Sequence, residues 1–589
     1  MGSTEPQDIA IGPRWGTFRD EFRPYRRDVW LTGGLAAVAA AAELVVVGIL
    51  GVLGAAAFAG TDSPVGLPLG HYLSRTTLSV TLVVTVLMRG LLQLILASVQ
   101  QRMLYRYEQQ ARTELLGAFL DAEWATQSSM ESTDVYNAIF SFLNQARTAL
   151  QCATDAVGSA VNFAFMVGGS FLIGGPWTFA IVGGSVLLAW ALRPFIHASR
   201  KAAKDSREAS RRFVAAMVET IALARESRLF GVNHRVKKRD GAASEAVADA
   251  NRRSGLASKR LSVVYTTAVY AVAAAGLAAV ILADVHNPAP YVTVVLLLYR
   301  GLGYGQALQS SYQTLISSEP AIEWLRQTRS ELVENALPSG GSAFVPPLDA
   351  IQFSSVSFSY SDDVAAVEDL DFIIERGDAV GVVGPSGAGK STLVQLLLRL
   401  RVPTRGEIHV NGQDITTLDP QSWFGHVVLV PQEARLANMS VLDNVLWFRH
   451  HLTRDDAIGA LRSAHVLDEM LALPDGLETG VGEEGARLSG GQRQRLCIAR
   501  ALAAAPDVII LDEPTSALDL ISEEAIRQTL AELHGRITLI IIAHRLSTLR
   551  VCDRVMVLRD GRMEAFADRE DLERNNEFYA ETLRLSRLV

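Results

Sequence analysis

Cysteine is scarce in this chain of 589 residues, which contains only Cys152, Cys497 and Cys552. They lie far apart with no CxxC spacing, which excludes a disulfide framework and a cysteine zinc site and predicts reduced thiols. Charged residues are also few, at 20%, and the net charge of −8 argues against nucleic acid as the main partner. Hydrophobic residues reach 49%, which is high for a soluble protein. The length predicts about two to four domains.

Residues 1–28 combine basic and aromatic side chains, among them Arg14, Trp15, Arg26 and Arg27. No apolar core of a signal peptide follows within this stretch, so a cleaved signal peptide is not expected. Such a composition before a membrane span favours a short cytoplasmic helix on the inner membrane surface. A disordered basic tail is the alternative.

Long runs with almost no charge begin at residue 29 and predict a transmembrane domain over 29–330. The first run, Trp30 to Gly60, is longer than the ~20 apolar residues that cross a bilayer as a helix. The six candidate spans are Trp30–Gly60, Leu78–Val99, Ala153–Ile173, Trp177–Leu192, Leu261–Ala283 and Tyr291–Tyr312.

Basic residues in the connecting segments predict the orientation. Segments 61–75, 174–177 and 284–290 contain a single one, Arg75, whereas segments 100–150 and 193–260 are rich in Arg and Lys. By the positive-inside rule, the long segments and both termini are cytoplasmic, in a multi-pass protein of the cytoplasmic membrane.

Residues 331–350 have the composition of a linker, with Pro338 to Ser342 and the pair Pro346-Pro347. From Ile351 an alternating apolar pattern predicts a strand that opens a soluble α/β domain over 351–589.

A P-loop follows the predicted buried strand Ala379–Val383 and opens into a helical run. Its glycines let backbone amides surround an anion, and the helix N-terminus adds its positive dipole end. Lys390 is expected to reach the β- and γ-phosphates, and Ser391 to bind Mg²⁺. The loop consists of Gly384, Pro385, Ser386, Gly387, Ala388, Gly389, Lys390, Ser391 and Thr392.

A second buried-strand pattern, Val508 to Leu511, ends in Asp512 and Glu513. An acid at the end of a strand near a P-loop is placed to hold Mg²⁺, directly or through water. The next carboxylate, Glu513, is placed to orient or deprotonate an attacking water.

A further phosphate cradle is predicted at a helix start, where Leu488, Ser489, Gly490, Gly491 and Gln492 precede the helical run 493–505. Two cradles in one chain suggest that ATP lies between the P-loop of one subunit and this loop of another. With these motifs the sequence resembles the ATP-binding cassette (ABC) transporters, as an exporter-type half-transporter.

The resemblance implies a multidomain membrane protein. An all-α six-helix transmembrane domain, the type I exporter or type IV fold, precedes an α/β P-loop NTPase domain. It also implies the cofactors ATP and Mg²⁺, a homodimer, and ATP-driven export of a small molecule, lipid or peptide by alternating access.

Several residues take roles from the resemblance alone. It implies adenine stacking by Tyr360, a contact with Mg²⁺ by Gln432, and a magnesium-linked role for Asp512. It further implies that Glu513 is the catalytic carboxylate, that Asp519 lies in a loop crossing the dimer interface, and that His544 contacts the γ-phosphate. The stretch 433–440 departs from the usual family pattern, as does Leu520-Ile521. Because Glu513 and 488–492 are both intact, a homodimer is favoured over a heterodimer with a second half-transporter.

The two long cytoplasmic segments are expected to extend the spans as helices over 100–120 and 198–225, roughly 30 Å into the cytoplasm. Their tips, Asp121 to Asp134 and Arg228 to Lys238, are expected to contact the nucleotide domain. A solvated hairpin is the alternative.

Ionisable residues within the spans, among them Glu43, Arg89 and Arg300, suggest function. Glu43 and Arg300 fall at similar depth, which suggests an intramembrane pair or a place in the translocation cavity. Arg89 is expected nearer the cytoplasmic side, where it snorkels or faces a cavity.

Two other functions fit the same pattern. One is an importer of a metal-chelating small molecule on the exporter-like fold. The other is a membrane ATPase that regulates a partner complex without moving a solute.

Overall fold

Two compact units make up the chain, and each is described by itself. A computed structural model describes residues 15–58, 65–66, 72–130, 135–136, 138–174, 193–282, 289–338, 340–361, 364–515, 518–543, 545 and 548–586. The first unit comprises Met1–Gly117 and Ser132–Ser330. The second comprises Ala118–Glu131 and Glu331–Val589.

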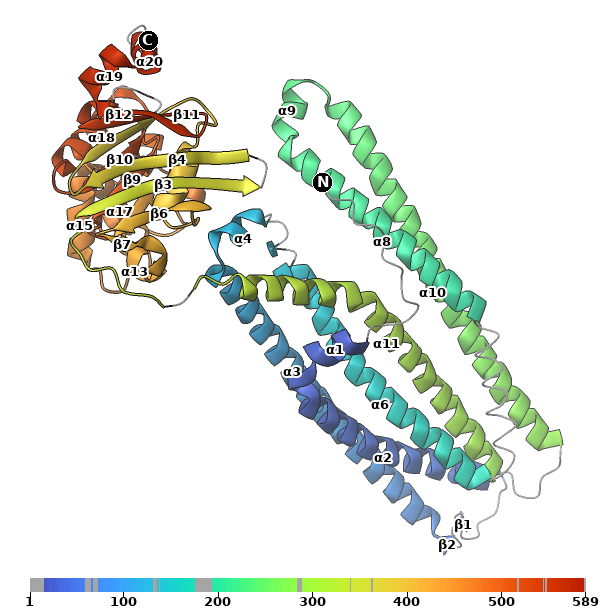
Figure 1. Ribbon diagram of the computed structural model, residues 1–589. Coiled ribbons are helices and arrows are strands. Elements are labelled where there is room, and N and C mark those ends of the chain that lie inside the picture. The colour runs from blue at the N-terminus through green and yellow to red at the C-terminus, as the bar shows by residue number, and fades with distance from the viewer. Residues whose placement is uncertain are drawn as a thin grey trace. The chain divides into compact units, whose positions relative to one another are not determined.

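Long helices dominate the first unit (Figure 1). A two-stranded antiparallel hairpin pairs β1 (Val65–Gly66) with β2 (Tyr72–Leu73), and a π-helical turn, Ala138–Phe142, precedes α6. The helices are α1 (Trp15–Glu21), α2 (Arg26–Phe58), α3 (Arg75–Asp121), α6 (Leu143–Gly174), α8 (Arg193–Ala222), α9 (Ala224–Leu229), α10 (Asn233–Leu282) and α11 (Ala289–Glu334).

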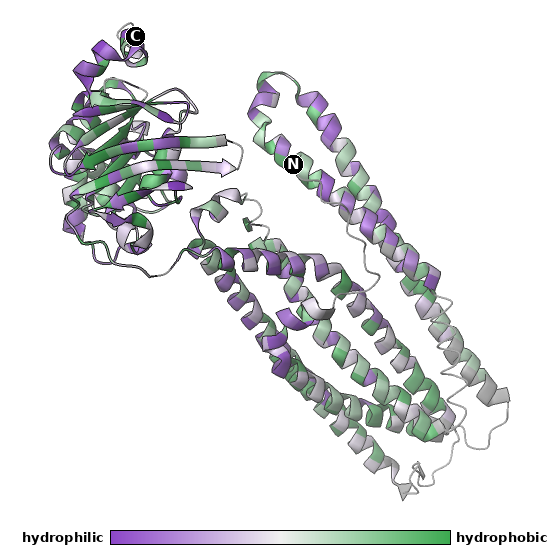
Figure 2. Ribbon diagram, in the orientation of Figure 1, coloured by the Kyte–Doolittle hydropathy of each residue, from purple (hydrophilic) through white to green (hydrophobic). Residues whose placement is uncertain are grey.

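Five of the six predicted spans overlap these helices, and the fourth, Trp177–Leu192, lies outside the described residues. Hydrophobic residues line much of α2 and α6 (Figure 2). Among the described residues, three helical segments are long and apolar enough to cross a membrane, namely Arg23–Gly54, Thr76–Asp121 and Ala138–Ile173. The helical extensions expected over 100–120 and 198–225 are present in α3 and, to Ala222, in α8.

The described part of the N-terminal segment, α1 and the turn that follows it, is anchored on other helices, and residues 1–14 lie outside the described residues. Phe22 and Tyr25 are buried, and each packs edge-on against Tyr107 of α3, with ring centroids 5.7 and 5.6 Å apart. The Tyr107 hydroxyl donates to Glu21 (3.1 Å), which also pairs with Arg329 of α11 (3.0 Å). The N-terminal segment therefore joins α3 to α11.

Helices α8 and α10 pack on each other along their length, as a hairpin closed by α9. Thr220 donates to Asp240 across it (2.7 Å), and Arg239 pairs with Glu219 (3.4 Å). At its tip, Leu229 and Phe230 are 74% and 79% exposed in the single chain. Large apolar side chains at such a tip form an unpartnered surface.

The second unit contains two sheets. A six-stranded sheet has the order β12-β11-β5-β10-β9-β8, in which only β12 runs antiparallel to its neighbour. An antiparallel sheet has the order β4-β3-β6-β7. The strands are β3 (Ala350–Ser361), β4 (Val364–Glu375), β5 (Ala379–Val383), β6 (Arg405–Val410), β7 (Gln413–Asp414), β8 (Val427–Val430), β9 (Val508–Asp512), β10 (Thr538–Ile542), β11 (Arg554–Arg559) and β12 (Arg562–Asp568).

Helices cover the six-stranded sheet (Figure 1), and β5, β9 and β10 are almost continuously buried because apolar residues occupy both of their faces. The α-helices of this unit are α4 (Trp124–Ser129), α12 (Lys390–Leu397), α13 (Pro420–Phe424), α14 (Val441–Leu446), α15 (Arg454–Ser463), α16 (Leu467–Leu471), α17 (Gly490–Leu502), α18 (Leu520–Leu533), α19 (Arg569–Asn575) and α20 (Glu577–Ser586).

The stretch with linker composition packs on the sheets where it is described. Phe344 is buried with its ring 5.4 Å from that of Trp423, and its backbone N–H donates to Ser422 (2.9 Å). The tip that contains α4 belongs to the same compact unit. There the Leu337 N–H donates to the Asp121 carbonyl (2.7 Å), and Arg401 donates to Ser128 (3.4 Å).

Candidate nucleotide-binding site

The P-loop connects β5 to α12, in the strand–loop–helix order that the sequence predicts. Gly389 precedes α12 with φ of +99°, and a Cβ there would lie 2.6 Å from the Ala366 carbonyl oxygen, so a side chain is excluded. The Lys390 ammonium donates to the carbonyls of Gly384 (2.7 Å) and Pro385 (2.9 Å), which fixes it at the loop. Burial lowers the pKa of Lys390, while the carboxylates of Glu513 and Asp512 act in the opposite direction.

The two acids predicted at a strand end lie where β9 finishes. Asp512 is opposite Ile542 of β10, and the Glu513 N–H donates to the Ile542 carbonyl (3.0 Å). Glu513 has φ of +45°, an uncommon conformation for a residue with a side chain. Its carboxylate accepts from Gln432 Nε2 at 2.7 Å. Glu513 and Gln432, 81 positions apart in the sequence, are thus brought together, and both line one cavity of about 510 Å³.

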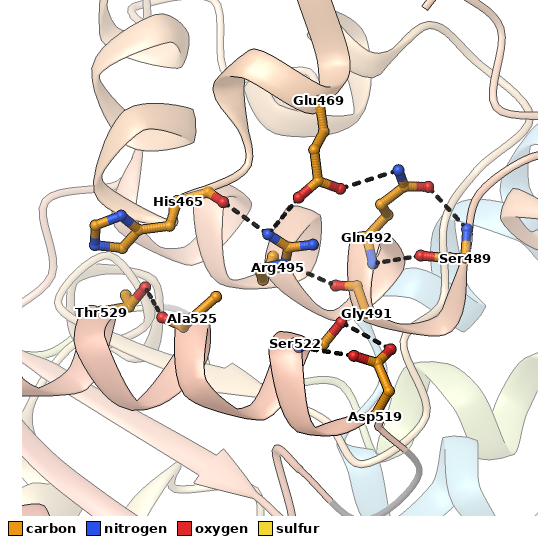
Figure 3. Close-up of polar contacts among 10 residues, drawn as sticks. All are labelled: His465, Glu469, Ser489, Gly491, Gln492, Arg495, Asp519, Ser522, Ala525 and Thr529. Carbon is orange, nitrogen blue, oxygen red and sulfur yellow. Dashed lines mark hydrogen bonds and ion pairs between the residues drawn. The ribbon is translucent and has the colours of Figure 1, made fainter. Parts of the chain in front are cut away.

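The glycine-containing helix start is built by a capping box, shown in Figure 3. Ser489 Oγ accepts from the Gln492 N–H (3.2 Å), and the Gln492 side-chain oxygen accepts from the Ser489 N–H (2.9 Å). These reciprocal bonds satisfy backbone donors at the start of α17. Glu469 accepts from Gln492 (3.0 Å) and pairs with the buried Arg495 (2.7 Å), which ties α16 to this helix start.

Gly491 gives α17 its close approach to α18. A Cβ at this position would lie 2.0 Å from Ser522 Oγ, so no side chain fits. Ser522 in turn donates through its N–H and its hydroxyl to Asp519, at 2.9 and 3.1 Å. The Ser522 backbone N–H is the main cause of a lowered pKa at Asp519. The predicted residues 489–492 and Asp519 therefore lie on two helix starts in contact.

Sequence reasoning missed the residues that hold the segment after Gln432. Asn444 is fully buried and exchanges hydrogen bonds with the backbone of Ala437, at 3.0 and 2.9 Å. Arg500 donates to the Asn444 side chain (2.9 Å) and to the Arg435 carbonyl (3.1 Å). A signal existed, because Arg500 interrupts the apolar helical run Leu496 to Ala505, and a charge on an apolar face needs polar partners.

Tyr360 lies at the end of β3 and is 55% exposed. Its hydroxyl is 3.2 Å from Thr392 Oγ1 and its ring faces the Arg401 guanidinium at 5.3 Å, so Tyr360 lies beside the helix that follows the P-loop. His544, Ser516 and Ala517 lie outside the described residues.

Glu43, Arg89 and Arg300 of the membrane helices form one cluster. Glu43 on α2 is 2% exposed, and Arg300 Nη2 lies 2.6 Å from its Oε1. The expectation that Arg89 snorkels is wrong: its Nη2 and Nε donate to Glu43 Oε2 at 2.9 and 3.2 Å. The Tyr304 hydroxyl donates to the same oxygen at 2.5 Å. A buried carboxylate is costly to leave unpaired, and this cost explains why the long Arg89 side chain turns toward it.

A P-loop beside a parallel sheet, a strand-end acid pair and a glycine-containing helix start define a nucleotide-binding domain, here joined to a helical domain of membrane type. The ABC transporter family model matches residues 367–516. Over its whole length the chain resembles a bacterial Atm1-family ABC exporter with ATP bound. That likeness has a TM-score of 0.78 and 24% identity, and covers 96% of this chain and 98% of the other.

Residues 367–516 therefore form an ABC transporter domain, and the chain has the fold of an ABC exporter half-transporter. The predicted fold class is confirmed, and the predicted ABC family is confirmed for residues 367–516.

Curated relatives match over part of the chain. Human ATP-binding cassette sub-family B member 6 is 42% identical over 36% of this chain and 25% of its own length. The beta-(1→2)glucan export ATP-binding/permease protein NdvA of Agrobacterium vitis is 38% identical over 41% of each chain. The ATP-dependent lipid A-core flippase of Chromobacterium violaceum is 42% identical over 38% of each chain. The chain thus covers between a quarter and about two fifths of these relatives.

The contact between α17 and α18 leads to a prediction. Gly491→Ala forces its methyl group against Ser522, and we expect a loss of about 1–3 kcal/mol of stability, the usual cost of overpacking. Thermal unfolding of the purified chain measures it. Ser522→Gly combined with Gly491→Ala should recover part of the loss. Gly459→Ala on α15, where a Cβ meets nothing within 4 Å, is the control. Equal melting temperatures of Gly491→Ala and wild type would contradict the packing argument.

Proposed function

We propose that the chain is an ATP-driven membrane transporter of the exporter type, which acts as a dimer and couples ATP hydrolysis to alternating access. The observation that carries this proposal is the pairing of Gln432 with Glu513 at the end of β9. In the sheet, β10 alone separates β9 from β5, the strand that precedes the P-loop. A residue after β8 is thereby linked to the acid that the resemblance assigns to catalysis.

In this proposal the P-loop amides, Lys390 and Thr392 bind the nucleotide phosphates, and Tyr360 stacks on the adenine. The Ser391 hydroxyl, the Asp512 carboxylate and the Gln432 amide oxygen suit Mg²⁺, which prefers hard oxygen ligands. Bound Mg²⁺ neutralises charge on the transferring phosphoryl group. Glu513 accepts a proton from the attacking water, and His544 contacts the γ-phosphate.

Glu513→Gln tests the catalytic role. The substitution removes the proton acceptor and keeps a hydrogen-bonding side chain beside Gln432, so steady-state ATP hydrolysis should fall by about 10²-fold or more while ATP binding remains. Phosphate release and nucleotide binding by the purified, membrane-reconstituted chain measure the two effects. Glu433→Gln is the matched control, since Glu433 is exposed and pairs only with the exposed Arg435 among the contacts described. Wild-type hydrolysis by Glu513→Gln would overturn the assignment.

We further propose a homodimer in which each ATP lies between the P-loop of one subunit and residues 488–492 of the other. The exposed tip of α9 then docks on the nucleotide domain of the partner. Coexpressed chains carrying Lys390→Ala and Gly490→Asp separately test the shared site. Their mixed dimer contains one site with both lesions and one with neither.

We expect the mixed dimer, isolated through two different affinity tags, to hydrolyse ATP at about half the wild-type rate if the two sites are independent, while each parent homodimer is inactive. The double substitution in one chain, paired with a wild-type chain, serves as the control because each of its sites then carries one lesion. An inactive mixed dimer alongside an active control would mean that each chain uses only its own two loops.

The direction of transport is proposed as export from the cytoplasm. The support is that one relative is named as an exporter of beta-(1→2)glucan and another as a lipid A-core flippase. The positive-inside distribution of Arg and Lys supports a cytoplasmic location for both termini and the nucleotide domain. The membrane is then the cytoplasmic membrane.

Inside-out vesicles decide the direction. ATP added outside such vesicles should drive accumulation of a transported compound, and a chain with Glu513→Gln should not support it. ATP-dependent depletion of a preloaded compound would instead identify an importer. ATP hydrolysis that no compound stimulates, together with a stable third partner, would favour a regulatory ATPase.

A further inference from the structure

One carboxylate in the membrane helices contacts two guanidinium groups and neutralises the charge of only one. Glu43 contacts both Arg89 and Arg300, so the cluster carries one excess positive charge. No other acid occurs within the six predicted spans except Asp155. Asp155 lies on α6 near the level of Thr32, because Gly158 lies opposite Ala36. Along α2, Thr32 lies roughly 17 Å from Glu43, since an α-helix rises ~1.5 Å per residue. The excess charge at Glu43 therefore has no local counter-ion among the described residues.

The two arginines are held differently. Arg89 makes two hydrogen bonds to Glu43 Oε2, and its side chain is 23% exposed. Arg300 is 49% exposed in the single chain, and although its Nη2 lies 2.6 Å from Oε1, that oxygen accepts no well-directed hydrogen bond. Since Oε2 also receives the Tyr304 hydroxyl, Arg89 and Tyr304 together hold Glu43. Arg300 has N–H groups that no hydrogen bond among the described residues uses, and it can therefore donate to a ligand.

Next to this cluster, a cavity of about 450 Å³ lies between α2, α3, α6 and α11. Tyr304 belongs to both the cluster and the cavity wall. Arg300, Tyr304, Ala307, Ser311 and Thr314 are spaced 4, 3, 4 and 3 residues apart, which places them on one face of α11. Arg300 thus stands one helical turn beyond the end of the cavity.

The cavity wall is rich in hydroxyl and amide side chains and contains no Lys or Arg. Its single carboxylate, Asp155, accepts from Gln100 at 2.7 Å and lies far from Arg300 along the helices. An anionic group is disfavoured beside Asp155 and favoured beside Arg300, so a ligand with one anionic end has one preferred orientation.

We propose that this cavity binds a small polar molecule that carries one anionic group, a carboxylate or phosphate, with that group on Arg300 and its hydroxyl or amide groups along α11. Glu43 is fixed by Arg89 and Tyr304 and limits the excess charge of the cluster to +1. The anion is therefore bound, but weakly enough to be released. The inference rests on the proposed transport function and names the substrate class for it.

The experiment uses the full chain in nanodiscs of zwitterionic lipid and measures probe-dependent thermal stabilisation. Four probes share one sugar frame: gluconate, glucose 6-phosphate, glucose and glucosamine. We expect half-maximal stabilisation at a concentration about tenfold lower for the two anions than for glucose, equivalent to about 1.4 kcal/mol. Arg300→Gln should abolish this preference and Arg300→Lys should retain much of it. Arg102→Gln, an exposed arginine further along α3, should behave as wild type.

Equal or weaker stabilisation by both anions, or a preference that survives Arg300→Gln, would overturn the proposal. Nanodiscs with phosphatidylglycerol provide a separate arm. If that lipid alone gives an Arg300-dependent stabilisation and neither soluble anion does, the site recognises a lipid headgroup and the proposal of a small polar ligand fails. ATP hydrolysis by the wild-type nanodiscs is measured in parallel. Hydrolysis without an anion preference refutes only this inference, whereas absent hydrolysis refutes the proposed function.

Discussion

The parallel register of β5, β10, β9 and β8 is the constraint on which the nucleotide site depends. Because the carboxyl ends of parallel strands meet at one edge of a sheet, the P-loop after β5, the acid pair ending β9 and Gln432 after β8 all reach that edge. A slip of one residue would turn every side chain of a strand to the opposite face. The contact between Gln432 and Glu513 exists only in this register.

Polar side chains, and not apolar packing alone, hold the start of α17. Ser489, Gln492, Glu469 and Arg495 form one connected set around the start of α17, and each satisfies a donor or acceptor of another. Buried polar groups left without partners are costly, so such a set fixes the backbone of the loop that it surrounds.

In the helical unit the same cost operates more strongly, since a membrane interior supplies no water to charged groups. The sequence pointed to a pair between Glu43 and Arg300 from their similar depth, and the structure confirms that contact. The sequence did not predict the contact between Arg89 and Glu43, because the depth of Arg89 along its helix does not determine where its long side chain reaches. Tyr304, an ordinary aromatic residue by sequence, completes the cluster through its hydroxyl.

The sequence by itself determined the α/β nucleotide domain, the helical domain before it and the P-loop, while the ABC class came from a resemblance of its motifs. Each of these depends on local spacing, which the chain alone specifies. Only the tertiary structure decided which distant residues meet, as for Asn444 with Arg500, Gly491 with Ser522, and Glu43 with Arg89. No local pattern records such contacts, because they result from packing elements that are separated by tens to hundreds of residues.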